Sequence, residues 1–309
     1  MILILGSTGY IGEEFKRQLD ELKIETLCIS REDYDYYDLE TLLQIIKTKQ
    51  PEFLINCAGY TGKPNVDACE GNQNEAFAAN VTLPRVIAKV CAMTDTPWGH
   101  VSSGCIYNGE SSAANGYTEE DLPNFCWDTS NCSYYSGTKA EAEKLIQEEK
   151  GECYIWRLRI PFDKNDGPRN YLSKLMNYKM LLDANNSISH KGDFVKYCLA
   201  LWQTKADFGI YNIVNTKPIT TKKVTEKINK LLGINKDFKF FRNEKHMYDM
   251  GFAITPRSNC VLDNTKLRKA LSPHKIKVRT TLQALDSSLR HWASKDKQED
   301  NVIPNSFWD

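Results

Sequence analysis

The first twelve residues constrain what this chain can fold into more than any other segment. A short apolar run, Ile2–Leu5, leads directly into Gly6, which is followed by Gly9 and Gly12. Glycines at this spacing let the backbone turn tightly and approach a pyrophosphate, while the helix that follows offers unpaired N–H groups and a positive dipole end. Because three glycines also occur by chance in ordinary turns, a dinucleotide site needs a second motif in its support.

That second motif is a tyrosine and a lysine four residues apart, Tyr135 and Lys139. At the start of an expected helix, both side chains project from one face. A nearby ammonium, together with the cationic nicotinamide of an oxidised cofactor, stabilises a phenolate and lowers a pKa that is normally about 10. We therefore expect Tyr135 to move a proton to or from a carbinol oxygen. Tyr134 lacks this spacing and is expected to point elsewhere. The alternative is that Tyr135 and Lys139 are simply two residues of an ordinary amphipathic helix, where such a spacing is common.

A serine is expected to complete this catalytic group. Ser103 follows an expected strand, so it lies at the carboxyl edge of the sheet, where α/β enzymes place their ligands. Its hydroxyl can hydrogen-bond a substrate oxygen and hold it in place. We expect Ser102, one residue earlier, to be a packing residue.

The composition bounds the classes of partner. A chain of 309 residues, 41% of them hydrophobic, is long enough for a large nucleotide-binding domain and a smaller second one. Lys plus Arg and Asp plus Glu each total 40, so we expect neither nucleic acid nor an anionic membrane as a partner. The apolar start lacks a signal-peptide pattern, and no stretch approaches the ~20 apolar residues of a membrane span. A soluble, cytoplasmic protein is expected.

The ten cysteines are scattered, with no Cys-x-x-Cys motif and no paired histidines beside them. Because structural zinc sites use closely spaced cysteines and histidines, we expect no metal site. Many free thiols are typical of a protein in the reducing cytosol.

Short apolar strands and amphipathic helices alternate along the first half of the chain, which predicts an α/β fold with a Rossmann-type, doubly wound parallel sheet. The expected strands are 2–5, 25–29, 53–56, 98–102 and 153–159, and the expected helices are 12–22, 39–49, 74–93 and 135–150. From Pro161 the sequence becomes rich in Asp, Asn, Gly and Pro, which marks a domain crossing. The predicted division is a dinucleotide-binding domain of residues 1–160 and 188–216, and a smaller, discontinuous α/β substrate domain of residues 161–187 and 217–309.

The end of the second strand indicates which dinucleotide binds. An acidic residue there holds the ribose hydroxyls of NAD, whereas a small residue followed by arginine accommodates the extra phosphate of NADP. Ser30 and Arg31 therefore favour NADPH, with NADH as the alternative if Arg31 is only a solvated loop cation. The residues expected to bind the cofactor are Gly6, Thr8, Gly9, Tyr10, Ile11, Gly12, Ser30, Arg31, Asp38, Leu39, Cys57, Ala58, Gly59, Tyr135 and Lys139.

The glycine fingerprint, Ser103 and the Tyr135/Lys139 pair together resemble the extended short-chain dehydrogenase/reductase family, which acts mostly on nucleotide sugars. Within it the chain looks most like the nucleotide-rhamnose synthase/epimerase-reductases, with the dTDP-4-dehydrorhamnose reductases as more distant relatives. The segments that carry the closer match are 56–70, 103–106, 120–125, 168–174 and 255–259. They run from the first third to the last sixth of the chain, so the match does not rest on one local segment.

The resemblance implies a reaction beyond reduction. In those enzymes a UDP- or dTDP-linked 4-keto-6-deoxy-glucose is epimerised at carbons 3 and 5, then reduced at carbon 4 with NADPH to the L-rhamnose nucleotide. Cys105 and Lys174 match the family's cysteine and lysine that act as acid and base in the epimerisation. A thiol ionises more readily than a hydroxyl, especially near a cation. The alternative is that Cys105 is one more small buried residue among ten cysteines.

The resemblance also implies a set of substrate-binding residues, namely Lys63, Asn65, Asp67, Asn170 and Arg257. The planar guanidinium of Arg257 suits a diphosphate. Each of these residues is otherwise a polar group of a structural loop. Relatives often pair through two helices of the nucleotide domain, so we expect a homodimer through residues 74–93 and 138–150.

Other functions stay in view. A single-function 4-ketoreductase keeps Cys105 and Lys174 but exchanges no protons at carbons 3 and 5. A non-catalytic dinucleotide sensor has no need for a catalytic tyrosine, so Tyr135 argues against it. Phenylalanines alternate with basic residues in 236–245, which we interpret as a half-buried strand rather than an RNA-binding segment. We assign no role to the tail, residues 294–309.

Overall fold

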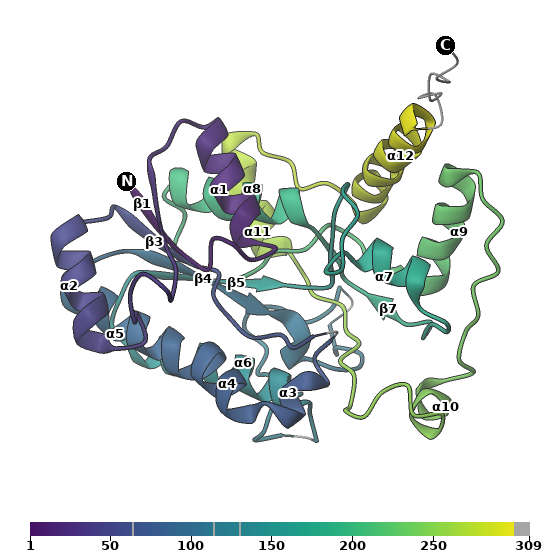
Figure 1. The fold of residues 1–309 in the computed structure, drawn as a ribbon, viewed down its shortest axis with the longest axis horizontal. Coiled ribbons are helices and arrows are strands. Elements are labelled where there is room, and N and C mark those ends of the chain that lie inside the picture. Colours follow the sequence, from purple (N-terminus) through teal and green to yellow (C-terminus); the bar gives the residue numbers. More distant parts are fainter. Residues whose placement is uncertain (64, 114, 130, 300–309) are drawn as a thin grey trace, which may run out of the picture.

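Parallel strands form the centre of the protein in the computed structural model, which describes residues 1–299 except 64, 114 and 130. Six of them make one sheet in the order β2-β1-β3-β4-β5-β9, and every pairing in it is parallel. Their bounds are Ile2–Leu5 (β1), Thr26–Ile29 (β2), Phe53–Asn56 (β3), Trp98–Ser103 (β4), Cys153–Leu158 (β5) and Gly209–Asn212 (β9). The predicted α/β, doubly wound fold is confirmed (Figure 1).

Helices cover both faces of the sheet because alternate strand residues enter different cores. Ile2 and Ile4 of β1 belong to one core, and Leu3 and Leu5 belong to the other. Strands of a parallel sheet are apolar on both faces for this reason. The first face packs against α1 (Gly12–Glu21), α8 (Lys191–Gln203) and α11 (Thr265–Leu271), and the second against α2 (Leu39–Lys49), α5 (Leu83–Thr94) and α6 (Tyr134–Glu148) (Figure 1).

The direction in which strands are added to the sheet switches between β1 and β3. These two strands are neighbours, while the chain runs outward from them in opposite directions, to β2 on one side and to β4 on the other. In open α/β sheets, ligands bind outside the carboxyl ends of the strands at such a switch point. The loops that follow β1 and β3 therefore flank the candidate cofactor site.

The long helix predicted over 74–93 is one helical run with a change of pitch at its middle. It consists of α4 (Gln73–Phe77), a π-helical turn η1 (Ala78–Thr82) and α5. By length and composition the run Gln73–Thr94 is apolar enough to cross a membrane, which corrects our expectation that no stretch of the chain would be. Because 56% of its apolar window is buried inside the protein, as in a core helix, this is weak evidence for a span.

A second core lies beside the sheet and joins two separated stretches of chain, one around Phe162 and Leu172 and the other around Val224 and Leu285. The elements around it are β6 (Pro161–Phe162), α7 (Tyr171–Asn177), β7 (Asn185–Asn186), β8 (Ser189–His190), β10 (Ile219–Thr220), α9 (Thr221–Leu232) and α12 (Thr281–Glu299). Helix α10 (Glu244–Asp249) packs in a separate small cluster. Helix α11 departs from the predicted division: although it falls in 217–309, its apolar residues pack in the core of the main sheet.

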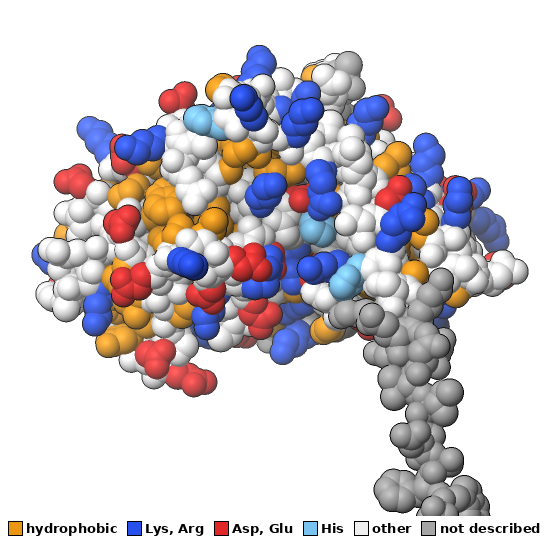
Figure 2. All heavy atoms as spheres, turned by 90° about the horizontal axis from the view of Figure 1, so that it is seen from above, with side chains coloured by type: hydrophobic (Ala, Val, Ile, Leu, Met, Phe, Trp, Pro, Cys, Tyr) orange, Lys and Arg blue, Asp and Glu red, His pale blue; other side chains and the backbone are white. Residues whose placement is uncertain are grey.

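The remaining short elements are α3 (Ala68–Gly71) and the 3-10 turns η2 (Gly104–Ile106) and η3 (Ser272–His274). The strand predicted within 236–245 is wrong in form, because Phe240 makes only an isolated bridge with Leu181 before α10 begins at Glu244. Acidic and basic side chains are interspersed on the face that Figure 2 shows, in line with the balanced composition. Residues 300–309, most of the tail without an assigned role, lie outside the described residues.

Candidate active site

The loop between β1 and α1 is so closely built that two of its glycines have no room for a side chain. A Cβ added at Gly6 would lie 2.5 Å from the Ala58 nitrogen, and one at Gly12 would lie 2.1 Å from the Gly6 carbonyl oxygen. Gly6 also has a φ of +76°, which glycine adopts without steric penalty. The tight turn leads into the start of α1 at Gly12, which is buried, while Thr8 and Gly9 of the loop are exposed just before it. A tight glycine turn into a helix N-terminus fits a dinucleotide pyrophosphate.

The end of β2 presents the predicted arginine to solvent. Arg31 is exposed, and Ser30 before it donates from its hydroxyl to Asp33 Oδ2 at 2.7 Å. Asp38 caps α2 by accepting from the Thr41 N–H at 2.8 Å. Its predicted place over the adenine stays a prediction, as do the cofactor contacts of the remaining residues, Tyr10, Ile11, Leu39, Cys57, Ala58 and Gly59.

Ser103 and Tyr135 meet at the carboxyl end of β4. Ser103 is the last residue of β4 and is 5% exposed; Tyr135 lies in the first turn of α6 and is 8% exposed. Burial and the neighbouring Cys105 raise the pKa of Tyr135 above its usual value, and a hydrogen bond with Ser103 lowers it only in part. The expected lowering of this pKa relied partly on a cationic nicotinamide, whereas the net effect of the protein's own groups is in the opposite direction.

Lys139 lies one turn further along α6 than Tyr135. Its side chain is 4% exposed, and Nζ donates to the Val101 carbonyl oxygen at 3.3 Å. A Cβ added at Gly59 in the loop after β3 would lie 3.6 Å from this nitrogen. Burial lowers the pKa of Lys139 to about 8. The ammonium therefore lies between the catalytic helix and the loop predicted to run along the cofactor.

Asn80, which the sequence analysis did not single out, holds that loop in place. It is fully buried in the π-helical turn η1. Its Oδ1 accepts from the Tyr60 N–H at 2.8 Å, while Nδ2 donates to the Tyr60 carbonyl at 2.8 Å and to Thr138 Oγ1 at 3.1 Å. Asn80 thus ties the loop after β3 to α6. The sequence signal that could have identified Asn80 was its polar side chain inside an apolar helical run. In the structure it lies in a π-helical turn, and such turns often occur at functional sites.

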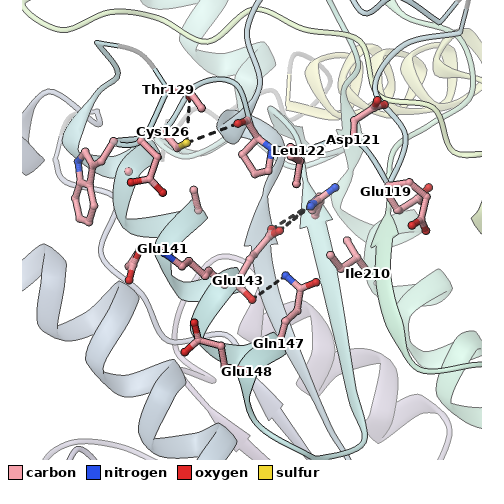
Figure 3. Close-up of a pocket in the computed structure, with 18 residues that line it drawn as sticks. Glu119, Asp121, Leu122, Cys126, Thr129, Glu141, Glu143, Gln147, Glu148 and Ile210 are labelled. Carbon is pink, nitrogen blue, oxygen red and sulfur yellow. Dashed lines mark hydrogen bonds and ion pairs between the residues drawn. The ribbon is translucent and has the colours of Figure 1, made fainter.

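Further along α6, Glu143 forms an ion pair with Arg157 of β5. Figure 3 shows the Glu143 carboxylate directed from the helix toward the strand, at the side of a pocket between α6 and the loop that contains Asp121. None of the predicted catalytic residues, all of which the structure describes, lines this pocket. The pocket is therefore separate from the candidate active site, while the ion pair itself fixes α6 against β5.

Cys105 lies in the turn directly after Ser103, and its backbone N–H donates to Ser103 Oγ at 3.2 Å. The side chain is half-buried and packs in one small cluster with Tyr135. Arg159, another residue that the sequence analysis missed, donates from Nη1 to Cys105 Sγ at 3.0 Å. The structure thus brings the predicted cysteine, serine and tyrosine together.

Lys174 lies on α7 and is half-buried. Burial and the charge of Arg169 lower the pKa of Lys174, and the same guanidinium acts to lower the pKa of Tyr135. Arg169 also donates to Thr61 Oγ1 in the loop after β3. It therefore connects the Lys174 segment to the loop after β3, although Lys174 itself makes no hydrogen bond to Cys105 in the described part of the chain.

Two of the predicted substrate residues pair with each other. Arg257 Nη2 donates to Asp67 Oδ2 at 2.6 Å, and Thr255 Oγ1 donates to Asp67 Oδ1 at 2.7 Å. The Arg257 N–H donates to the Tyr248 hydroxyl at 2.9 Å. Asp67 therefore holds the segment 255–257 against the loop that follows β3, and its carboxylate contacts a guanidinium suited to a diphosphate.

The other predicted substrate residues differ in exposure and in the hydrogen bonds that their side chains already make within the protein. Lys63 is exposed, whereas Asn65 Oδ1 accepts from the Asp67 N–H at 2.8 Å within its own loop. Asn170 is fully buried and caps α7 by accepting from the Leu172 N–H at 3.0 Å. Its amide also donates to the backbone of the same loop, so the structure gives it a loop-building role. Substrate contacts of all these residues stay predictions.

Residues 1–290 match a known protein family, described as the RmlD substrate binding domain. A trifunctional UDP-glucose 4,6-dehydratase/UDP-4-keto-6-deoxy-D-glucose 3,5-epimerase/UDP-4-keto-L-rhamnose-reductase of Arabidopsis thaliana is 30% identical over 277 residues, 86% of this chain and 39% of that protein. This chain thus spans about two fifths of the length of that relative. A bifunctional dTDP-4-dehydrorhamnose 3,5-epimerase/dTDP-4-dehydrorhamnose reductase of the same plant is 28% identical, and the match covers 86% of both chains.

Solved structures share the fold. The UDP-rhamnose synthase of Acanthamoeba polyphaga mimivirus superimposes with a TM-score of 0.82 at 20% identity, covering 94% of this chain and 98% of that one. The dTDP-4-dehydrorhamnose reductase of Bacillus anthracis, solved in complex with NADP, has a TM-score of 0.75 at 16% identity and covers 95% and 97%.

Proposed function

This chain belongs to the family of the RmlD substrate binding domain, and on that premise we propose that it converts a nucleotide-linked 4-keto-6-deoxy-glucose to the L-rhamnose nucleotide. Its general chemistry is the NAD(P)H-dependent reduction of a 4-keto sugar. The finer proposal is that epimerisation at carbons 3 and 5 precedes reduction at carbon 4.

The observation that carries the reduction is the meeting of Ser103, Tyr135 and Lys139 at the carboxyl edge of the sheet. Ser103 and Tyr135 share a hydrogen bond and can both contact one ketone oxygen. Because its pKa lies above the usual value, Tyr135 holds its proton at neutral pH. It can therefore donate that proton to the oxygen as the ketone becomes an alcohol. The Lys139 ammonium stabilises the phenolate that remains.

The proposed cofactor is NADPH, with NADH as the alternative. When bound, NADPH supplies the hydride for carbon 4. The residues fit it: the glycine loop turns tightly into the start of α1 with Thr8 and Gly9 exposed, and Arg31 is exposed at the end of β2, where the phosphate of NADP is recognised. A structural neighbour with the same fold was solved with NADP.

Cys105 and Lys174 are the proposed acid and base of the epimerisation. A carbon next to the ketone loses a proton to one group and regains one from the other on the opposite face. Hydrogen bonds from Ser103 and Tyr135 to the ketone oxygen would stabilise the enolate formed in between. Two features support this part: Cys105 packs beside Tyr135, and the bifunctional relative, which has both activities in its name, matches over 86% of its length.

The proposed substrate carries UDP or dTDP, and Arg257 is the residue best suited to its diphosphate. A single-function 4-ketoreductase is the second candidate, because the activities of the longer relatives come from chains of which this one covers only part. We also propose a homodimer that pairs through residues 74–93, the helical run of α4, η1 and α5, and through residues 138–150 of α6 and its end, as the family resemblance indicates.

The test is to incubate the protein with NADPH and UDP-4-keto-6-deoxy-glucose in deuterated water and to analyse the product by NMR. Deuterium at carbons 3 and 5 of an L-rhamnose product is the expected result. Cys105→Ala should lose this label, whereas Cys132→Ala, a control at another half-buried cysteine, should retain it. Reduction without deuterium would leave the single-function ketoreductase, and the absence of any reaction would count against this substrate.

A further inference from the structure

Arg159 is a buried cation in contact with Cys105 of the candidate active site. It follows β5, is 2% exposed, and donates from Nη2 to Asn186 Oδ1 and to the Ser258 carbonyl, both at 2.6 Å. Its Nη1 donates to Cys105 Sγ at 3.0 Å. Arginine stays protonated in proteins, so a full positive charge is buried here.

The neighbours of Arg159 leave this charge without a carboxylate. Within the described residues, its acceptors are an amide oxygen, a carbonyl oxygen and a thiol sulfur, and no Asp or Glu forms an ion pair with it. A buried charge is unfavourable unless an opposite charge compensates it. Of the three acceptors, only the sulfur of Cys105 can become an anion by losing a proton.

The local backbone is arranged to accommodate this contact. Gly104 makes room for the arginine stem, because a Cβ there would lie 3.3 Å from Arg159 Cδ and 2.6 Å from Leu262 Cδ1. Ile160, directly after the arginine, has a φ of +37°. Positive φ is strained for a β-branched residue and persists only where the surrounding structure imposes it.

We propose that Arg159 is the counter-ion of a Cys105 thiolate and positions that sulfur as the proton acceptor at the sugar. The catalytic consequence rests on the proposed epimerase function, but the ion pair itself does not. In the proposed step the thiolate takes a proton from the carbon next to the ketone and becomes a thiol. Lys174 then supplies a proton to the opposite face, and both groups recover their protonation states by exchange with water.

Besides Arg159, other titratable groups face Cys105, and their charges also affect its ionisation. Tyr135 and Lys139 face it from α6, Cys69 from α3, and Cys260 from the segment beside β7. A thiolate at Cys105 disfavours the phenolate of Tyr135, which keeps the tyrosine protonated for the later reduction. Lys139 is the other cation in this group and stays in place in the variants of Arg159, so those variants test the charge at position 159.

The first experiment uses the unmodified protein without substrate. The rate of alkylation by iodoacetamide is followed at Cys105 and at Cys132 by peptide mass spectrometry over a range of pH. Cys132 is also half-buried, but burial raises its pKa to about 11. We expect Cys105 to react at least about tenfold faster at neutral pH and to reach its plateau at lower pH. A Cys105 profile that follows that of Cys132 would overturn the proposal.

The second experiment compares Arg159→Met with Arg159→Lys. Methionine keeps the stem but removes the charge, so alkylation of Cys105 at neutral pH should fall at least about tenfold while Cys132 is unaffected. Lysine should preserve most of the rate. If Arg159→Met does not fold, the alkylation profiles of Cys105 in the lysine variant and in the unmodified protein still test the proposal. An unchanged Cys105 profile in a folded methionine variant would contradict the proposal.

The same variants separate this proposal from the proposed function. A reactive Cys105 that depends on Arg159, in a protein that places no deuterium at carbons 3 and 5, would retain the ion pair and refute the epimerase. Conversely, deuterium incorporation that Arg159→Met leaves unchanged would retain the epimerase and refute a role for Arg159 in it.

Discussion

Glu143 lies one helical turn beyond Lys139 on α6. Its carboxylate acts to raise the pKa of Lys139 and forms an ion pair with Arg157 of β5. Burial lowers the pKa of Lys139, and the charge of Glu143 opposes this effect. The ion pair has an Arg157 Nη2 to Glu143 Oε2 distance of 2.7 Å, and both side chains are 2% exposed. Ser102 also donates to Glu143 Oε1 at 2.5 Å. One buried carboxylate therefore fixes α6 against the sheet and supports the charge of Lys139.

Replacing Glu143 with glutamine should destabilise the fold and weaken the Lys139 ammonium. The change leaves Arg157 buried without its partner, so the free energy of unfolding should fall by about 3 kcal/mol in urea denaturation. The pKa of Lys139 should fall further as the opposing charge is removed. Glu148→Gln, on the exposed face of the same helix, is the control and should change stability by less than about 0.5 kcal/mol. Equal stability of the two variants would contradict this reading.

Tyr135→Phe should abolish turnover without affecting cofactor binding. Removing the hydroxyl takes away the proton donor for the ketone oxygen, so kcat should fall at least about 100-fold. Tyr134→Phe is the matched control: its ring packs against Trp127 at a centroid distance of 5.4 Å, and it should retain turnover. NADPH affinity, measured by fluorescence titration, should be unchanged in both. Normal turnover in Tyr135→Phe would exclude this tyrosine as the acid.

Local motifs made much of the site predictable. The glycine fingerprint and the Tyr135/Lys139 pair each lie within a few residues and encode a turn or one helix face, so they could be recognised without tertiary structure. Arg157 and Arg159 escaped notice because they lie within an apolar stretch that was interpreted only as a buried strand. Charged residues two apart on one face of such a strand were a usable signal, since buried charges require partners.

Contacts between distant segments were not predictable. Asp67 and Arg257 are 190 residues apart and were both assigned to the substrate, yet they pair with each other. Asn80 is one polar residue in an apolar helix, and its partners come from two other elements. The domain division was limited by α11, because a short amphipathic helix carries no information about which core it joins.

Asp67→Asn should weaken substrate binding more than it affects chemistry. The carboxylate holds both Arg257 and Thr255, so its loss should let the segment 255–257 move away from the loop after β3. We expect KM for the sugar nucleotide to rise about tenfold with kcat nearly unchanged, as for a loss of uniform binding. Asp249→Asn, which removes an exposed ion pair with Lys245, is the control. A normal KM in Asp67→Asn would show that the pair does not prepare the site.

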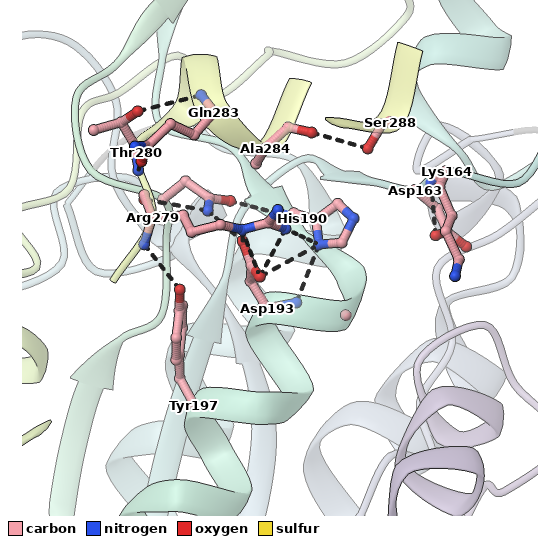
Figure 4. A network of polar contacts seen from close by, with 12 residues as sticks. Asp163, Lys164, His190, Asp193, Tyr197, Arg279, Thr280, Gln283, Ala284 and Ser288 are labelled. Atoms are coloured by element: carbon pink, nitrogen blue, oxygen red, sulfur yellow. Dashed lines mark hydrogen bonds and ion pairs between the residues drawn. The ribbon is translucent and has the colours of Figure 1, made fainter. Parts of the chain in front are cut away.

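Asp193 gives the last prediction, an acid-dependent loss of stability. It lies at the start of α8, where Arg279 Nη2 is 2.8 Å from its Oδ1 and Asn215 Nδ2 donates to Oδ2 at 2.8 Å. Figure 4 shows Arg279, His190 and Asp193 converging at this junction. Burial raises the pKa of Asp193, but hydrogen bonds and charges of His190 and Arg279 outweigh it and leave the pKa below its usual value.

The sign of the effect follows from that lowered pKa. A carboxyl group with a lower pKa in the folded state stabilises the fold above its unfolded pKa of about 3.9, and this contribution is lost as pH falls through the folded value. Asp193→Asn should therefore reduce the free energy of unfolding by about 1 to 2 kcal/mol near neutral pH, because Arg279 is 34% exposed and water screens the charge left without its partner. The difference from the unmodified protein should narrow below about pH 4 in urea titrations. Asp286→Asn removes a more exposed pair with Lys227 and should change stability by less than about 1 kcal/mol. A pH-independent difference for Asp193→Asn would show that its charge does not stabilise this junction.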